Sequence, residues 1–459
     1  MEESSYRLGT EKLSKLIVKF SLPCIVSLVI TALYNIVDQI FIGNSELSTL
    51  GNAATGAVFP FFVVAQGFSW CFGDGCAAFL NLCQGMKEDQ RAHRAIGTGI
   101  LMTVAVSFLL MAIGYPFAEP LLFLFGASEN NIGMATEYLT IILAFFPVFM
   151  LSNMLASVIR ADGSPGWAMA STLAGAAVNL ILDPVFIFGL KAGMSGAAWA
   201  TVIGQTVSLA ICIFYCFRTK TFHFCKESFL PDFKEFFKAV RLGMSSFMAQ
   251  MTIAVIATVG NRMLAVYGSQ SVYGIDIPMA VMSIESKVYA IVINIIVGFV
   301  LGCQPVISYN YGAEKYDRVK KLWKYSFLFT MIVGIGALLL FELAPKFVVG
   351  WFGEPTNIEN VDAYWEFAER LFRIFLALVV CTCFIKMSAV FFQAVGRPVN
   401  AVICSLVRDI VCYVPLMLIL TQFVGIDGVL YAAPIADAVG FAVAVGLTVA
   451  FWRSLKKKE

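Results

Sequence analysis

The feature that most constrains this chain is a series of long apolar stretches that fill almost all of it. Hydrophobic residues make up 59% of the 459 residues and charged residues only 14%, whereas apolar residues make up about 45 to 50% of an ordinary soluble domain. A helix needs roughly 20 apolar residues to cross the hydrocarbon core of a bilayer. The sequence therefore predicts an all-α membrane protein. The twelve expected spans are residues 16–43, 53–83, 96–117, 134–158, 167–189, 195–217, 240–267, 276–304, 325–349, 366–394, 400–423 and 428–452.

Lysine and arginine residues gather on one side of these spans. They are frequent before the first span, between the second and third, in the central segment and at the C-terminus, whereas the loops on the other side hold only Lys191, Arg262 and Lys346. Short loops rich in Lys and Arg stay in the cytoplasm. Both termini are therefore expected inside the cell, in a multi-pass protein of the cytoplasmic membrane.

The two halves of the chain repeat one pattern. Because six spans are an even number, both halves begin on the same side, and such parallel repeats are related by an axis along the membrane normal. We therefore expect a six-helix lobe over residues 1–217, a cytoplasmic linker over 218–239 and a second six-helix lobe over 240–459, related by pseudo-two-fold symmetry. The matched residues are Gly75, Gly85 and Arg91 with Gly302, Gly312 and Arg318, all at an offset of 227, Gly163 and Pro165 with Gly396 and Pro398, and Gly193, Gly196 and Ala200 with Gly425, Gly428 and Ala432.

Several classes of function are disfavoured by what the sequence lacks. The net charge is only +2, so no broad basic surface for binding nucleic acid is expected. The sequence contains no phosphate-binding GxxxxGK motif, so nucleotide binding is not expected. The twelve cysteines include no CxxC pair, so they indicate neither a disulfide framework nor a metal site, and no cofactor other than a coupling ion is expected. The stretch Cys71-Phe72-Gly73-Asp74 lacks the first glycine of an intramembrane aspartyl protease loop. An enzyme is therefore not expected.

A carboxylate inside the first span, Asp38, is the strongest indication of function. A charged aspartate at the centre of a membrane helix costs at least about 2.5 to 3.5 kcal/mol, so it normally faces a cavity lined by protein. Such a residue in a chain of many spans indicates a transporter of a small-molecule substrate across the bilayer.

A second polar group is expected at a similar depth in the first half. Asn179 and Asp183 lie four residues apart and therefore on one helix face, and Pro184 loosens the backbone beside them. Thr201, early in the next span, is expected at the same depth. Oxygen ligands suit a hard cation. Two close carboxylates repel each other when both are ionised, so one of them tends to bind a proton or a cation. These residues predict a proton or sodium site, unless Asn179 and Thr201 only cap or bridge helices.

These motifs together resemble the multidrug and toxic compound extrusion (MATE) family over nearly the whole chain. The resemblance rests on Pro23, Asn35-Ile-Val-Asp38, Gly43, Asn179-x-x-x-Asp183-Pro184 and the glycine pattern from Gly193 to Thr201. It implies a polyspecific antiporter that exports organic cations in exchange for protons or sodium ions by alternating access. It further implies a cation-coupling site at Asp38, Asn179, Asp183 and Thr201, a substrate cavity with Tyr34, Asn35 and Asn153, and helix bends at Pro23 and Pro184.

The second half departs from the first. Span 7 offers Asn261 and span 10 offers Lys386 where some members of the family carry acids, so a coupling site there is not expected. Glu285 is the best substrate-binding candidate in this half, with an internal salt bridge as the alternative. Lys386, Arg408 and Asp409 are expected to form a structural ion cluster. A flippase for lipid-linked or other amphipathic substrates stays open as an alternative function, although it would favour a basic cavity.

Overall fold

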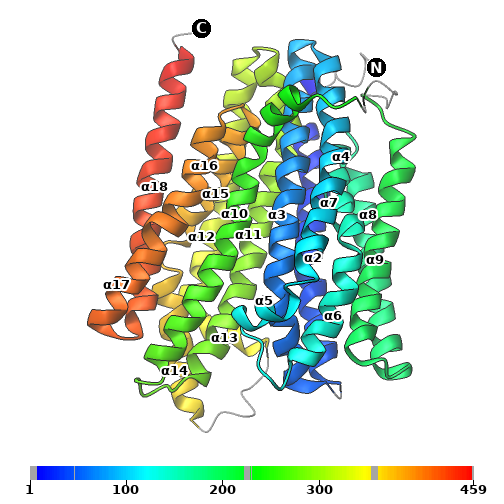
Figure 1. Ribbon diagram of the computed structural model, residues 1–459. Helices are drawn as coiled ribbons and strands as arrows, with labels where there is room; N and C mark the ends of the chain where they lie inside the picture. The colour runs from blue at the N-terminus through cyan, green and yellow to red at the C-terminus, as the bar shows by residue number, and fades with distance from the viewer. Residues whose placement is uncertain (1–7, 46, 222–227, 229, 353–359, 457–459) are drawn as a thin grey trace. The chain divides into compact units, whose positions relative to one another are not determined.

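The first half of the chain forms a series of long helices interrupted by one short helix and one π-helical segment (Figure 1). The computed structural model describes residues 8–45, 47–221, 228, 230–352 and 360–456. The elements of this half are α2 (Leu13–Gly43), α3 (Ser48–Met86), α4 (Asp89–Gly114), α5 (Ala118–Leu124), α6 (Ile132–Ala144), α7 (Phe146–Ala161), α8 (Pro165–Pro184), η1 (Val185–Gly189) and α9 (Gly193–Cys216).

The second half follows the same order. Three long helices come first, then a short helix, a bent pair, a helix that contains a π-helical segment, and a last long helix. The elements are α10 (Phe233–Gly268), α11 (Asp276–Gly312), α12 (Tyr316–Leu343), α13 (Pro345–Gly350), α14 (Val361–Phe375), α15 (Val379–Ala394), α16 (Pro398–Leu406), η3 (Val407–Tyr413), α17 (Val414–Val424) and α18 (Asp427–Lys456).

The expected twelve-span all-α membrane fold is confirmed, with two spans bent. Ten helices of the described residues are long and apolar enough to cross a bilayer, and two bent pairs raise the number of spans to as many as twelve. The pairs are α6 with α7, bent by 57°, and α14 with α15, bent by 50°. They stand fourth in each half. Pro147, in the first turn of α7, lacks the N–H that would continue the hydrogen-bond ladder from α6.

The two prolines expected to bend helices lie in different surroundings. Pro23 lies inside α2, which continues as one helix, and its carbonyl accepts a hydrogen bond from the Ser27 hydroxyl at 2.8 Å. Pro184 ends α8, and the backbone then widens into the π-helical segment η1, where the Leu190 N–H donates to the Val185 carbonyl at 2.9 Å. Because proline donates no backbone hydrogen bond, the change of helix type falls naturally beside it.

The internal repeat is visible in the backbone at its matched glycines. Gly163 and Gly396 have φ of 79° and 71°, and Gly193 and Gly425 have φ of 58° and 64°. A Cβ atom makes positive φ unfavourable, so glycine is favoured at all four turns. The repeated sequence pattern therefore marks turns of the same kind at the same places in each half.

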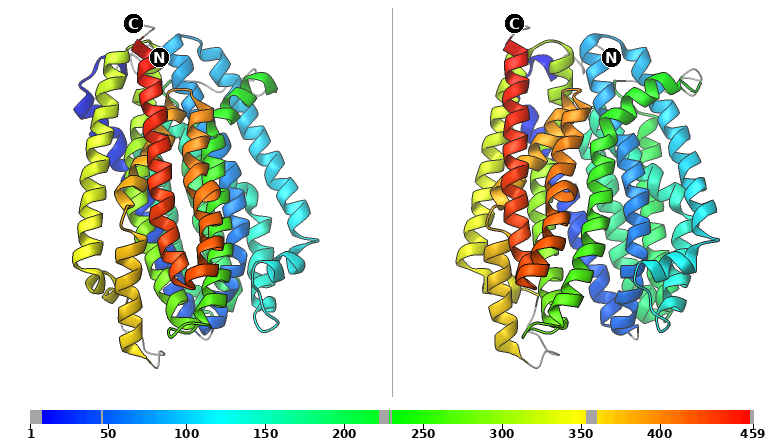
Figure 2. Two further views of the ribbon diagram at one scale, coloured as in Figure 1. Left: turned by 90° about the vertical axis from the view of Figure 1, so that its left-hand side faces the viewer. Right: turned by 60° about the vertical axis from the view of Figure 1, so that its left-hand side comes forward.

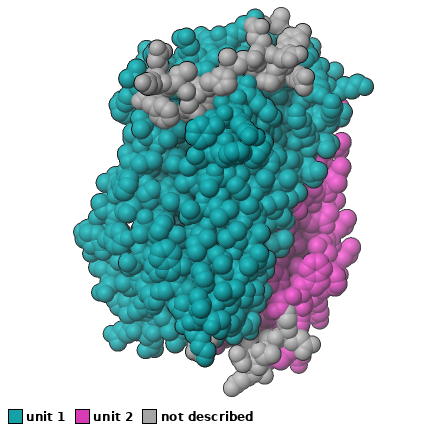
Figure 3. Space-filling view, turned by 90° about the vertical axis from the view of Figure 1, so that its right-hand side faces the viewer, with its two compact units in different colours: residues 1–251, 298–322, 393–398 teal, residues 252–297, 323–392, 399–459 magenta. Residues whose placement is uncertain are grey.

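Contacts divide the chain into two compact units, coloured separately in Figure 3. Unit 1 comprises residues 1–251, 298–322 and 393–398, and unit 2 comprises residues 252–297, 323–392 and 399–459. Unit 1 thus contains the first half of the chain together with one end of α10, α11 and α12. The division into lobes over 1–217 and 240–459 stays a prediction, and part of the linker between them, residues 222–227 and 229, lies outside the described residues.

Within unit 1, α3 packs against α4 and α7, α2 packs against α8, and α8 runs beside α9 (Figure 1). Two apolar clusters fill this unit, one around Cys76, Ala95 and Ile159 and the other around Leu139 and Val202. Within unit 2, α17 and α18 lie side by side after a short turn (Figure 2). The polar residues described next are therefore held on well-packed helices.

Candidate functional site

The predicted cation site lies in unit 1, where α8 and α9 approach each other closely. A Cβ atom on Gly175 would lie 2.8 Å from the Gly204 carbonyl oxygen, and one on Gly204 would lie 2.6 Å from the Gly175 carbonyl oxygen. Backbones that touch in this way need glycine on both sides. The contact brings the α8 face that carries Asn179 and Asp183 against the α9 face that carries Thr201.

Asn179 is at the centre of the polar contacts. Its Nδ2 donates to Asp183 Oδ1 at 3.3 Å and lies 3.5 Å from Thr201 Oγ1. The Thr201 hydroxyl in turn donates to the Ala197 carbonyl at 3.1 Å. Asn179 is 4% exposed and Asp183 is fully buried. The amide therefore joins α8 to α9 and at the same time orients one oxygen of Asp183.

Asp38, from α2, joins this group through Asp183. Their carboxyl groups lie within hydrogen-bonding reach of each other. Asp38 Oδ1 and Asp183 Oδ2 are buried atoms that have no hydrogen-bond partner among the described residues. Two ionised carboxylates offer no donor to each other, and buried unpaired acceptors are costly. A proton or a small cation held by the pair would satisfy both atoms.

Two tyrosines complete the surroundings of the acids. Tyr34, one turn before Asp38 on α2, interacts electrostatically with both carboxyl groups. Tyr138, from α6, has its hydroxyl within hydrogen-bonding reach of Thr201 and also interacts with Asp38. Tyr138 was not expected from the sequence. A hydroxyl within an apolar span is the signal that could have suggested it.

The other two predicted cavity residues are less closely tied to the acids. Asn35 is exposed on α2, and the Asn153 amide donates to the Phe149 carbonyl of its own helix at 2.9 Å. Their contribution to a substrate cavity stays a prediction.

Glu285 lies in unit 2, on α11, and is 2% exposed. Its Oε2 lies 3.4 Å from the Ser286 hydroxyl, and its Oε1 is buried with no hydrogen-bond partner in the part of the chain that the structure describes. Arg408 and Asp437 contribute to the electrostatic field at this carboxyl group. The ion pairs between described residues of this unit do not include Glu285.

A buried ion cluster in unit 2 connects α15, η3 and α18. Lys386 Nζ lies 2.8 Å from Asp409 Oδ2, and Arg408 lies 2.7 Å from both Asp409 and Asp437. The Thr382 hydroxyl also donates to Asp437, at 2.6 Å. Two cations face two carboxylates, so the cluster is neutral in itself. The expected ion cluster of Lys386, Arg408 and Asp409 is thus present. Asp437 is a further member, which the sequence did not predict because it lies on another helix.

The carboxylate, amide and hydroxyl groups at Asp38 and Asp183 fit the prediction of a proton or alkali-cation site, which stays a prediction. Within the described part of the chain, no group of three or more His, Cys, Asp or Glu residues could hold a metal ion. Carboxylate, amide and hydroxyl oxygens are the ligands that hard cations prefer.

Comparisons with known proteins agree with this architecture. The family model MatE matches residues 23–185 and 246–419. The multidrug export protein MepA of Staphylococcus aureus (strain NCTC 8325 / PS 47) is 23% identical over 439 residues, 95% of this chain and 94% of its own. MepA of Staphylococcus haemolyticus (strain JCSC1435) is also 23% identical, over the same shares.

Solved structures show the same fold. A crystal structure of MATE in complex with MaL6 matches with a TM-score of 0.89 and 22% identity over 98% of this chain and 99% of its own. A MOP superfamily transporter from Pyrococcus furiosus, described as having a binding pocket of reverse polarity, matches with a TM-score of 0.87 and 21% identity over 98% of each chain.

Proposed function

Because this chain belongs to the MatE family, we propose that it is a multidrug efflux antiporter that exports organic cations across the cytoplasmic membrane in exchange for protons or sodium ions. The observation that carries the proposal is the pair of carboxyl groups, Asp38 and Asp183, in contact within the membrane-spanning part of unit 1. Each group leaves one buried oxygen unpaired. The multidrug export named for the MepA relatives supports the same function.

The acid pair supplies a physical basis for exchange. When both groups are ionised, their charge in a medium of low dielectric constant attracts a cationic compound. When a proton or sodium ion neutralises one of them, that attraction weakens, and the compound is released. Drug and ion thus compete for the same charge and are not held there together. Exchange then requires that each of them binds one conformational state better than the other.

The amide of Asn179 favours a proton as the coupling ion. Its Nδ2 faces Asp183 Oδ1 and Thr201 Oγ1, so the amide acts here as a donor. A sodium ion would need oxygen atoms directed at it, and the Asn179 amide would have to turn over to provide one. A proton shared by Asp38 and Asp183 needs no such change.

The direct test is transport by the purified protein. In proteoliposomes, a labelled cationic dye should move against its gradient when a proton or sodium gradient is imposed, and comparing the two gradients identifies the coupling ion. No transport of the dye under either gradient would contradict the proposal. Movement of a fluorescent amphipathic lipid between leaflets would favour the flippase alternative.

Export requires a defined orientation, and the Lys and Arg distribution predicts it. A single cysteine at Lys320, at the start of α12, should react only with a reagent supplied from the cytoplasm. A cysteine at Glu129, before α6, should react only from outside. The measurement is labelling by a membrane-impermeant maleimide in intact cells and inverted vesicles. The reverse labelling pattern would invert the topology and the direction of transport.

Glu285 is proposed as a determinant of substrate charge. Among the described residues its buried Oε1 has no hydrogen-bond partner, and Glu285 is not a member of the neutral ion cluster of Lys386, Arg408, Asp409 and Asp437. Glu285→Gln should weaken export of cationic compounds by roughly tenfold, about the value of one charge-assisted contact, and change export of neutral compounds little. Transport rates of matched cationic and neutral dyes measure this difference. An equal loss for both dyes, with poor thermal stability, would indicate a structural role.

A further inference from the structure

The repeated arginines, Arg91 and Arg318, make contacts that the proposed coupling site does not explain. Each arginine follows the second long helix of its half. Each reaches the start of the first helix of the other half. All of these contacts lie within unit 1.

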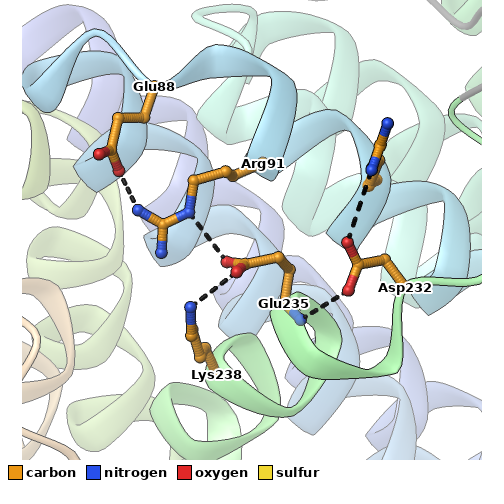
Figure 4. Close-up of polar contacts among 6 residues, drawn as sticks. Glu88, Arg91, Asp232, Glu235 and Lys238 are labelled. Atoms are coloured by element: carbon orange, nitrogen blue, oxygen red, sulfur yellow. Dashed lines mark hydrogen bonds and ion pairs between the residues drawn. The ribbon is translucent and has the colours of Figure 1, made fainter.

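Arg91, in the first turn of α4, holds the start of α10. Its Nε donates to Glu235 Oε2 at 3.1 Å, and its Nη1 pairs with Glu88 (Figure 4). Lys238 Nζ approaches the other Glu235 oxygen at 2.6 Å. The Glu235 side chain is 11% exposed and the Arg91 side chain 37%. The pair is therefore partly shielded from water and connects the two halves of the chain.

A second contact reinforces the same junction. Asp232 caps α10, since its Oδ1 accepts from the Glu235 N–H at 3.1 Å (Figure 4). Its own N–H donates to the Thr98 hydroxyl of α4 at 2.9 Å. Arg94 lies 3.9 Å from the other Asp232 oxygen. The start of α10 is thus fixed to α4 at two successive turns.

Arg318, in the first turn of α12, holds the segment before α2. Its Nη2 donates to the carbonyl oxygens of Leu8 and Glu11 at 3.2 and 2.8 Å, and its Nε donates to Asn310 Oδ1 at 2.9 Å. The Asn310 amide also donates to the Leu8 carbonyl, at 3.0 Å. Lys315 Nζ donates to the carbonyl of Gly9 at 3.1 Å.

The two sets of contacts are related by the internal repeat. Arg91 and Arg318 are 227 residues apart, and so are their partners Leu8 and Glu235. The turns that carry the arginines also match, because Lys87 and Glu314, again 227 residues apart, both have positive φ, 63° and 57°. At this position of the repeat, Arg91 contacts the carboxylate of Glu235, whereas Arg318 contacts the backbone carbonyl of Leu8.

Glycines matched by the repeat allow helices of the two halves to pack closely next to these arginines. A Cβ atom on Gly75 of α3 would lie 2.3 Å from the Ala239 carbonyl of α10, and one on Gly302 of α11 would lie 2.3 Å from the Ser21 Cα of α2. Each of these contacts therefore joins the second helix of one half to the first helix of the other half, backbone to backbone. Water cannot enter where backbones are this close.

Gly85 and Gly312 meet between these two contacts. A Cβ atom on Gly85 would lie 2.3 Å from the Tyr309 carbonyl, and one on Gly312 would lie 2.3 Å from the Leu82 carbonyl. The contact joins α3 to α11, the second long helices of the two halves. Within unit 1, the first two helices of each half thus touch those of the other half, backbone to backbone, next to these arginines.

We propose that Arg91 and Arg318 are paired positioning residues that hold the cytoplasmic end closed, and that both contacts must break before a compound can enter from the cytoplasm. The proposal rests on the alternating access of the proposed function. It adds a residue pair that sets the balance between the closed and open states of that end. The two clamps differ in chemistry, so salt should weaken the Arg91–Glu235 pair more than the Arg318 contact with carbonyl groups.

Two native cysteines report on opening of the two junctions. Cys303 of α11 is fully buried, with its Sγ 3.3 Å from the Ser21 hydroxyl of α2. Cys71 of α3 is 3% exposed and faces the Val240 carbonyl of α10. Proteins that retain only Cys303 or only Cys71 should be reconstituted in nanodiscs and treated with a maleimide. No substrate is needed, so the result does not depend on whether the dye assay succeeds.

Arg318→Ala should raise the labelling rate of Cys303 by roughly tenfold, because both hydrogen bonds from the guanidinium to the segment before α2 are lost. It should raise the rate of Cys71 by the same factor, since one opening of the end exposes both junctions. Arg91→Ala should raise both rates by about two- to fivefold, as expected for a partly exposed pair. Lys321→Ala, an exposed change on the same helix as Arg318, is the control and should leave both rates unchanged.

A charge exchange separates positioning from simple folding. Arg91→Glu with Glu235→Arg should return the labelling rates toward those of the parent, whereas each single exchange should raise them. Transport by Arg318→Ala should show a lower KM for dye on the cytoplasmic side and a lower kcat, since the open state is favoured. Faster labelling only at the cysteine next to each substitution, or no change at either, would overturn the proposal.

Discussion

Asp38→Asn is expected to lose ion-driven transport while it still folds and binds dye. Asparagine keeps the shape of the side chain but cannot release a proton or carry a charge, so it imitates the neutralised state permanently. Gradient-driven export should fall by roughly 5- to 150-fold, the range of typical coupling free energies. Dye binding through aromatic contacts, Tyr34 among them, should be weakened much less. Dye uptake into inverted vesicles and equilibrium binding in detergent measure the two effects separately.

The partner substitution tests whether the carboxyl groups act as one unit. Asp183→Asn should resemble Asp38→Asn, and the double variant should be little worse than either, because residues that work together are not additive. Glu119→Gln, an exposed carboxyl at the start of α5, is the control and should transport normally. Transport by Asp38→Asn near the parent rate would remove this pair from coupling and direct attention to Glu285.

The sequence predicts the site better than it predicts the surroundings. Asp38 and Asp183 are conspicuous because a charge within an apolar span has few explanations. Asn179 follows from helix periodicity, and its 3.3 Å contact with Asp183 agrees with that spacing. Tyr138 gives a weaker signal, its hydroxyl within an apolar span, since a tyrosine there is most often a packing residue. Its contact with Thr201 depends on how α6 lies before the bend at Phe145.

Contacts between distant parts of the chain explain most of what the sequence could not supply. The repeat of Arg91 and Arg318 is visible in the sequence, but their partners Glu235 and Leu8 are fixed only by the packing of the helices. Asp437 likewise joins Arg408 from another helix. The length of each apolar stretch shows whether it can cross a bilayer, so hydropathy predicts the number of spans. It does not detect the bends within the fourth and tenth spans, because a bend leaves composition unchanged.

Arg408→Met is expected to destabilise the protein more than any surface substitution. Asp437 is 1% exposed, and Arg408 lies 2.7 Å from it. Removing the cation leaves Asp437 as a buried carboxylate with only the Thr382 hydroxyl, and breaking a buried pair in this way costs about 3 to 5 kcal/mol. Asp409 loses less, because Lys386 remains 2.8 Å away. Thermal unfolding in detergent, followed by tryptophan fluorescence, gives the difference in stability.

Removing both charges separates the cost of an unpaired carboxylate from that of lost packing. Arg408→Met combined with Asp437→Asn should recover most of the stability, because the neutral amide can still accept from Thr382 and no buried charge is left alone. Arg453→Met, an exposed change on α18, should alter the Tm little. If the double variant is stable and still exports cationic dye, the cluster is structural. If it is stable but inactive, the cluster takes part in transport, and Glu285, within its electrostatic field, is the residue through which it acts.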